Sequence, residues 1–163
     1  MYASSRNVGG SWFSKLFGKP KAVVPEPPAN IEPPKSETDL DKAWHGIHYM
    51  LTKSAWEGEP PLNFLVLGGT EIGDIDVGYG PARAINSEGV REIHEELSKI
   101  SEEELRSRFD PAEMTKLDVY PDIWDRDPAE DDTFGYCAEY FRTLKEFVAD
   151  AAERNLGLII YLS

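Results

Sequence analysis

The chain has 163 residues, which suits one domain with a sizeable core, and its net charge at pH 7 is −13. The charge is uneven, because residues 1–35 carry +3 and the other 128 residues carry −16. The acidic excess argues against nucleic acid as a partner, since phosphate backbones are bound by clustered Lys and Arg, and it would attract a basic partner instead.

The N-terminal segment differs in composition from the rest of the chain. The stretch KPKAVVPEPPANIEPPKSE holds six prolines and predicts an extended linker or loop with the composition of a mobile segment. Before it, SWFSKLFGK places apolar side chains at helical spacing, and two roles stay open for this short helix: packing on the core, or docking on a membrane surface or a partner. We therefore divide the chain into an N-terminal arm and Pro-rich linker, residues 1–36, and a folded domain, residues 37–163.

The stretch DLDKAWHGIHYMLT, residues 39–52, predicts a helix capped by Asp39. Four apolar residues recur at helical spacing and form one stripe: Leu40, Trp44, Ile47 and Leu51. Asp41, His45 and His48 fall together on the flank of that stripe, at the edge of the core. Gly46 leaves a gap on another side, where a second backbone could approach.

The middle of the chain mixes strands and helices. PLNFLVLGG, residues 61–69, predicts either a buried strand or a short helical turn, and its periodicity does not decide between them. TEIGDIDVGYGPARAIN, residues 70–86, ends in the alternation typical of a strand. Asn86 or Ser87 then begins a helix, whose apolar face holds four residues: Val90, Ile93, Leu97 and Ile100.

Several helix starts mark the C-terminal half. SEEE at 101–104 is a capping box, and DPAE at 110 and again at 127 places Asp at the cap and Pro at the first helical position. The last and longest helix has one apolar face: Phe134, Cys137, Phe141, Leu144, Val148 and Ala151. LIIYLS, residues 158–163, predicts a buried strand. We therefore predict an α+β fold that is rich in helix, with a small mixed or antiparallel sheet packed against several helices.

Asp41, His45 and His48 are the candidate catalytic residues, because their spacing of four and three positions puts them on one strip of a helix. Two interpretations stay open besides a metal site. The three side chains line a pocket without metal, or they are structural, with a histidine donating to a backbone carbonyl and Asp41 supporting the helix N-terminus. His-x2-His without H-E-x-x-H is a weak metal signal, so we assign no metal and no cofactor.

GGTEIGDIDVGYGPAR, residues 68–83, is the second candidate for a site, because its glycines let a backbone approach a ligand closely. It lacks the pattern of a phosphate-binding loop, a dinucleotide fingerprint or an EF-hand. With the aromatic residues near it, the candidate ligand-binding residues are Trp44, Glu71, Asp74, Asp76, Tyr79, Arg83 and Tyr120. The alternative is a tight structural loop whose acidic and basic side chains pair internally.

The chain has one cysteine, Cys137, which excludes an internal disulfide and favours a reducing compartment. Cys137 lies on the apolar face of the last helix, so we expect a buried thiol. We find neither an apolar run as long as the roughly 20 residues of a membrane span nor a secretory signal. The expected location is therefore cytoplasmic, with no membrane span.

Four stretches together resemble one family: DLDKAWHGIHYMLT, GGTEIGDIDVGYGPAR, YPDIW and EYFRTLKEFVADAAERNLGLIIYLS. They are similar to the DUF1877, or YfbM-like, family from about residue 37 onward, and SWFSKLFGK also looks like a segment of its members. The resemblance implies a small bacterial α+β protein and supplies no catalytic residue. Family members open with a strand and a helix that MYASSRNVGG does not match, so we expect an unpaired sheet edge, with lower stability or pairing with a second chain as a homo-oligomer.

Two functions follow from these features. We favour a binding or interaction module that recognises a basic protein or a small polar ligand. The alternative is a hydrolase-like small-molecule enzyme that uses His45 or His48 as general base, Asp41 to orient it, and Arg83 or Tyr79 to bind substrate. A shared concave pocket for the histidines and the GYGPAR loop would favour the enzyme, and histidines satisfied by backbone groups would favour the module.

Overall fold

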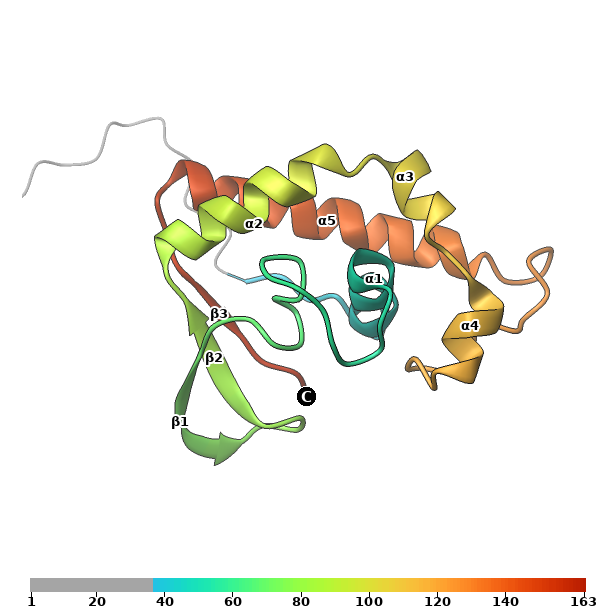
Figure 1. The fold of residues 1–163 in the computed structure, drawn as a ribbon, viewed down its shortest axis with the longest axis horizontal. Coiled ribbons are helices and arrows are strands. Elements are labelled where there is room, and N and C mark those ends of the chain that lie inside the picture. The colour runs from blue at the N-terminus through green and yellow to red at the C-terminus, as the bar shows by residue number, and fades with distance from the viewer. Residues whose placement is uncertain (1–36) are drawn as a thin grey trace, which may run out of the picture. The chain divides into compact units, whose positions relative to one another are not determined.

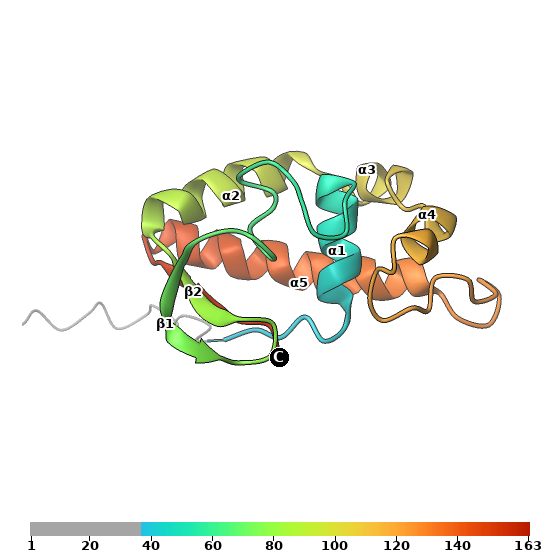
Figure 2. The same ribbon diagram turned by 60° about the horizontal axis from the view of Figure 1, so that its bottom comes forward.

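The computed structural model describes residues 37–163, so the expectations for residues 1–36 lie outside it. The described part folds as α1 (Ala43–Thr52), β1 (Thr70–Asp76), β2 (Pro81–Ile85), α2 (Ser87–Lys99), α3 (Glu102–Ser107), α4 (Pro111–Lys116), α5 (Thr133–Glu153) and β3 (Leu158–Ile160). Figures 1 and 2 show α2 lying along α5, the longest helix, with which α1 and α3 also make contact. The predicted α+β fold is confirmed.

Four of these helices have an N-cap residue whose side chain accepts a hydrogen bond from the first turn. Asn86 accepts from the backbone N–H of Gly89, Ser101 from that of Glu104, and Asp110 from that of Glu113, which confirms three predicted helix starts. The start predicted at the second DPAE is wrong. There the carbonyl of Asp127 accepts from the N–H groups of residues 130 and 131 and closes a single turn. The helix begins later, at the N-cap Asp132.

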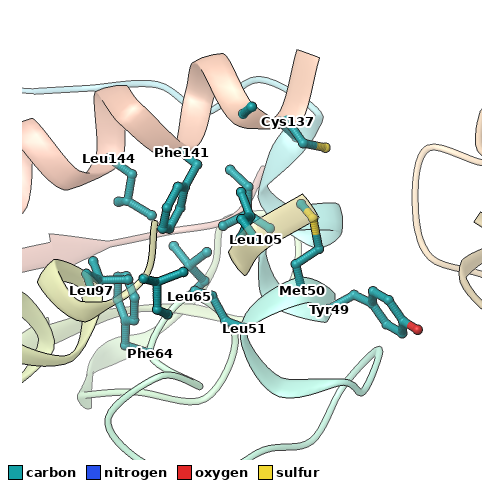
Figure 3. Packing of buried hydrophobic residues seen from close by; sticks show 14 of the residues in the cluster. Tyr49, Met50, Leu51, Phe64, Leu65, Leu97, Leu105, Cys137, Phe141 and Leu144 are labelled. Carbon is teal, nitrogen blue, oxygen red and sulfur yellow. The ribbon is translucent and has the colours of Figure 1, made fainter. Parts of the chain in front are cut away.

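The core lies between α5, α1, α2 and the segment 62–68. All six residues predicted for the apolar face of α5 are buried. The segment PLNFLVLGG is a helical turn, since the N–H of Leu67 donates to the carbonyl of Asn63. Figure 3 shows Phe141 and Leu144 pointing from α5 towards Leu65 and Leu97, which places the helical turn inside the same apolar cluster.

The sheet is antiparallel in the order β1-β2-β3, with Arg83 of β2 opposite Glu71 of β1 and opposite Ile160 of β3. All seven residues of β1 are exposed. The prediction that the C-terminal strand is buried is wrong, because Ile159 is 68% and Tyr161 61% exposed. Alternate residues of a strand face opposite sides, and no element of residues 37–163 covers the side that carries these two.

Candidate functional site

Helix α1 carries both candidate histidines and is enclosed on all sides. Every residue from Ala43 to Leu51 is buried, and His45 and His48 have no exposed surface. The expectation that the histidines lie at the edge of the core is therefore wrong, because the chain beyond the helix wraps the flank that carries them. Gly46 faces side chains and not a second backbone, since a Cβ there would lie 2.5 Å from the indole of Trp124.

Asp41 does not lie on this helix, and the predicted cap at Asp39 is wrong, because α1 begins at Ala43 and its N-cap Lys42 makes no side-chain cap. Asp41 precedes α1 with a left-handed φ of 46°, and its backbone N–H donates to the carboxylate of Asp39 at 2.8 Å. Its own carboxylate accepts from the Tyr136 hydroxyl on α5 at 2.9 Å, and burial together with this bond raises the pKa of Tyr136. Neither histidine hydrogen-bonds to Asp41, so the three candidates do not form a hydrogen-bonded catalytic group.

His45 joins two distant backbone segments. Its Nδ1 accepts from the N–H of Tyr120 at 3.0 Å, so the ring proton is on Nε2, which donates to the carbonyl of Ala55 at 2.6 Å. Burial lowers its pKa, although the Ala55 carbonyl opposes the shift. A neutral imidazole with both nitrogens bound to backbone groups fits the structural interpretation of this residue.

His48 lies one turn further along α1, with its ring centroid 6.4 Å from that of His45. Neither of its ring nitrogens has a hydrogen-bond partner. Burial and then the neighbouring His45 lower the pKa of His48 to about 4, and the nearby backbone of Glu57 opposes this shift without reaching hydrogen-bond geometry. The ring is therefore neutral at pH 7, and its burial carries the cost of unpaired polar atoms.

Four aromatic residues from separate segments meet at the surface beside His45. This aromatic cluster consists of Trp44, Trp56, Tyr79 and Tyr120. Trp44 is buried and stacks on the His45 ring at 4.6 Å between centroids, whereas the other three residues are 47%, 54% and 39% exposed, in chain order. The ring centroids of Trp44 and its three cluster partners are 5.6–6.3 Å apart. The structure thus brings together three of the predicted ligand-binding residues.

Sequence reasoning missed Trp56. This residue lies in the polar segment SAWEGEP, outside any apolar stripe, and its ring contacts Trp44, His45 and Tyr79. A large aromatic residue between Ser, Glu and Gly has no partner within its own element. That isolation is the signal that could have identified it.

The GYG turn holds Tyr79 in place. The carboxylate of Asp76 accepts from the N–H groups of Gly78 and Gly80, and these bonds lower its pKa. The N–H of Tyr79 donates to the carbonyl of Leu162 at 3.1 Å. Gly78 has a φ of 143°, and a Cβ there would lie 2.7 Å from that carbonyl, so glycine permits the close approach.

The remaining candidates do not join the cluster. The guanidinium of Arg83 donates to the carbonyls of Phe64, Leu65 and Gly68, so it caps carbonyl groups of the helical turn in the segment 62–68. Glu71 and Asp74 are exposed on β1.

No group of three metal-binding side chains occurs within residues 37–163, and no helix there is long and apolar enough to cross a membrane. Two shallow hollows, of about 330 and 440 Å³, are lined by other residues than those of the aromatic cluster. The first lies beside Pro60 and Pro61, and the second beside Trp124 and Arg126.

Fold and site together define a small α+β domain with an exposed aromatic surface. The model of the family described as "Domain of unknown function (DUF1877)" matches residues 14–161, so the chain belongs to this family. The match begins earlier than the residue 37 expected from the sequence motifs.

A solved structure shows the same fold. The crystal structure of YfbM from Escherichia coli, a protein of unknown function, is similar to this chain with a TM-score of 0.60 and 20% identity. The similarity covers 75% of this chain and 77% of YfbM. No curated protein matches the sequence.

Proposed function

We propose that residues 37–163 form a binding module and that the aromatic cluster is its contact surface. The observation that carries this proposal is the exposure of Trp56, Tyr79 and Tyr120, which are 47%, 54% and 39% exposed although they contact one buried ring, Trp44. Grouped aromatic side chains at a surface are enriched where proteins bind partners, because they bury much area at low entropic cost.

The cluster is held by backbone hydrogen bonds, which favours a binding role. His45 connects the segments that carry Trp56 and Tyr120, and the carbonyl of Leu162 holds the Tyr79 backbone. A surface that is ordered before its partner arrives loses less conformational entropy on binding.

The hydrolase-like alternative has less support. A general base must reach the proton that it removes, and both histidines are fully buried. Arg83, the predicted group for an anionic substrate, donates to backbone carbonyls instead.

The test is a binding screen with a matched pair of variants. Wild-type protein, the double variant Trp56→Ala/Tyr79→Ala and the control Ile159→Ala are compared against metabolites and short peptides by thermal shift and by tryptophan fluorescence. Ile159 is 68% exposed on β3 and is not one of the four cluster residues, so its loss controls for removal of apolar surface. A ligand should bind the wild type and the control alike and bind the double variant about tenfold more weakly or worse. Equal binding to all three proteins, or no ligand at millimolar concentration, would contradict the proposal.

A further inference from the structure

We propose that the aromatic cluster takes an arginine side chain from a basic protein partner. This inference rests on the proposed function and adds the chemistry of the group that is bound. The face of an aromatic ring carries negative charge density and attracts a cation lying within about 6 Å of the ring centroid. Trp56 and Tyr79 have centroids 6.3 Å apart and planes inclined by 28°, so one planar cation can reach both rings.

The charges around the cluster suit a cation. An exposed acidic residue lies within three positions of each exposed aromatic residue in the sequence: Glu57 directly after Trp56, Asp76 three positions before Tyr79, and Asp122 two positions after Tyr120. Asp76 accepts two backbone N–H groups, which keep it ionised. The ammonium of Lys53, three residues before Trp56, donates to the carbonyl of Arg108. Residues 37–163 as a whole carry 12 basic and 28 acidic side chains, so a basic partner would also be attracted from a distance.

The chain itself contains the contact that we propose. The guanidinium carbon of Arg106 lies 3.9 Å from the centroid of Phe134, whereas the lysine ammonium groups of Lys53 and Lys145 lie 5.4 and 5.6 Å from Tyr49 and Phe141. A planar guanidinium stacks flat on a ring, is more weakly hydrated than an ammonium group, and stays charged at all relevant pH values. Arginine is therefore the better match for the exposed ring faces.

The exposure of the cluster favours a protein over a small cation, because three of its four residues are largely or partly exposed. Small-molecule sites are concave and enclose most of their ligand. The two hollows described above share no residue with the cluster. Aromatic residues and arginine are both enriched at protein–protein interfaces, so three aromatic residues that are 39–54% exposed suit an arginine on the surface of a protein partner.

The experiment uses three peptides that differ only in the side chain offered. Each is a nine-residue Gly/Ala peptide with three copies of arginine, of lysine or of citrulline, which is the uncharged isostere of arginine. Titration calorimetry of the full chain at low and high salt should give binding of the arginine peptide that is about tenfold tighter than that of the citrulline peptide and severalfold tighter than that of the lysine peptide.

Three variants distinguish the contribution of the aromatic rings to peptide binding from that of the nearby carboxylates. Trp56→Leu/Tyr79→Leu keeps apolar area but removes the rings, and should weaken the arginine peptide about tenfold. Glu57→Gln/Asp122→Asn should weaken it severalfold and reduce its salt dependence. Glu95→Gln/Glu103→Gln makes the same change in net charge on exposed positions of the chain around α2 and α3, and should have little effect.

Each contrary outcome has a distinct meaning. Equal binding of the arginine and citrulline peptides, with loss of both in the leucine variant, would overturn the cation inference and leave the proposed function standing. Undiminished binding in the leucine variant would overturn both. Equal loss in the two charge variants, or no binding of the arginine peptide at millimolar concentration, would overturn the inference. If tetramethylammonium bound more tightly than the arginine peptide, the inference of a protein partner would be overturned in favour of a small cationic ligand.

Discussion

The Nδ1 atom of His45 on α1 accepts a hydrogen bond from the backbone N–H of Tyr120, which lies 75 positions away in the chain. The Nε2–H of the same ring donates to the carbonyl of Ala55, directly before Trp56. One buried imidazole therefore fixes two of the three exposed rings of the aromatic cluster.

Replacing His45 by Ala should destabilise the fold and disturb the cluster. The change leaves the Tyr120 N–H and the Ala55 carbonyl without a partner and removes a ring stacked on Trp44, so we expect a loss of about 2–4 kcal/mol in the free energy of unfolding. Urea unfolding gives this value, and near-UV circular dichroism reports the rearranged tryptophans. His94→Ala, on α2, is the control, with an expected loss of about 0.5 kcal/mol or less. A loss in the free energy of unfolding no larger than that of the control would show that the His45 hydrogen bonds do not stabilise the segments that hold Ala55 and Tyr120.

Acid should destabilise the fold through His48. Its pKa is about 4 in the folded protein and near 6.5 when unfolded, so the unfolded state binds the proton first as the pH falls. The contribution of neutral His48 to the free energy of unfolding is complete above pH 6.5 and is lost as the pH falls towards 4. The free energy of unfolding should therefore fall by about 2 kcal/mol between pH 7.5 and pH 5. Urea unfolding across this range measures it.

His48→Leu provides the control for this pH profile. It should make the profile between pH 7.5 and pH 5 less steep and keep most of the stability at pH 7, because two unpaired buried nitrogens are removed. A profile as steep as that of the wild type would assign the pH dependence to other groups.

Gly46→Ala should lower stability although alanine is the better helix former. The new Cβ would lie 2.5 Å from the Trp124 indole and 3.0 Å from the Cys137 sulfur. Overpacking of a core costs about 1–3 kcal/mol, which exceeds the gain of about 1 kcal/mol in helix propensity. Thermal unfolding measures the difference. Combining the change with Trp124→Phe should reduce its cost, and additive effects of the two substitutions would argue against the clash.

The thiol of Cys137 should be unreactive in the folded protein. It is fully buried on α5, and burial raises its pKa to about 12, so little thiolate forms at pH 8. Alkylation by iodoacetamide should be at least about a hundredfold slower for the native protein than for protein in urea. Comparable rates in the two states would mean that α5 opens readily around this residue.

Local patterns predicted most of the fold. The apolar faces of α2 and α5 follow from residue spacing, and Asn86, Ser101 and Asp110 act as caps within their own turns. The second DPAE failed because Asp127 closes a turn and Asp132, five residues later, competes as the cap. Both choices are compatible with the local sequence, and packing of the helix decides between them.

The candidate site was predictable only in part. Trp44, Tyr79 and Tyr120 were identified as candidates, but their meeting with Trp56 depends on contacts between segments distant in the chain. The burial of His45 and His48 was not predictable from helical spacing, because the flank of α1 is covered by the chain that follows the helix.

Strand β1 has one further consequence for handling the protein. Within residues 37–163 it is a sheet edge that exposes Ile72 and Ile75, and such edges invite intermolecular strand pairing. The same strand also carries the charged residues Glu71, Asp74 and Asp76, whose repulsion opposes that pairing. Since the sequence pI is about 4.6, mild acid brings the net charge of the chain towards zero and so weakens the repulsion between copies of the chain. Purification and storage near neutral pH should therefore keep aggregation through this edge low.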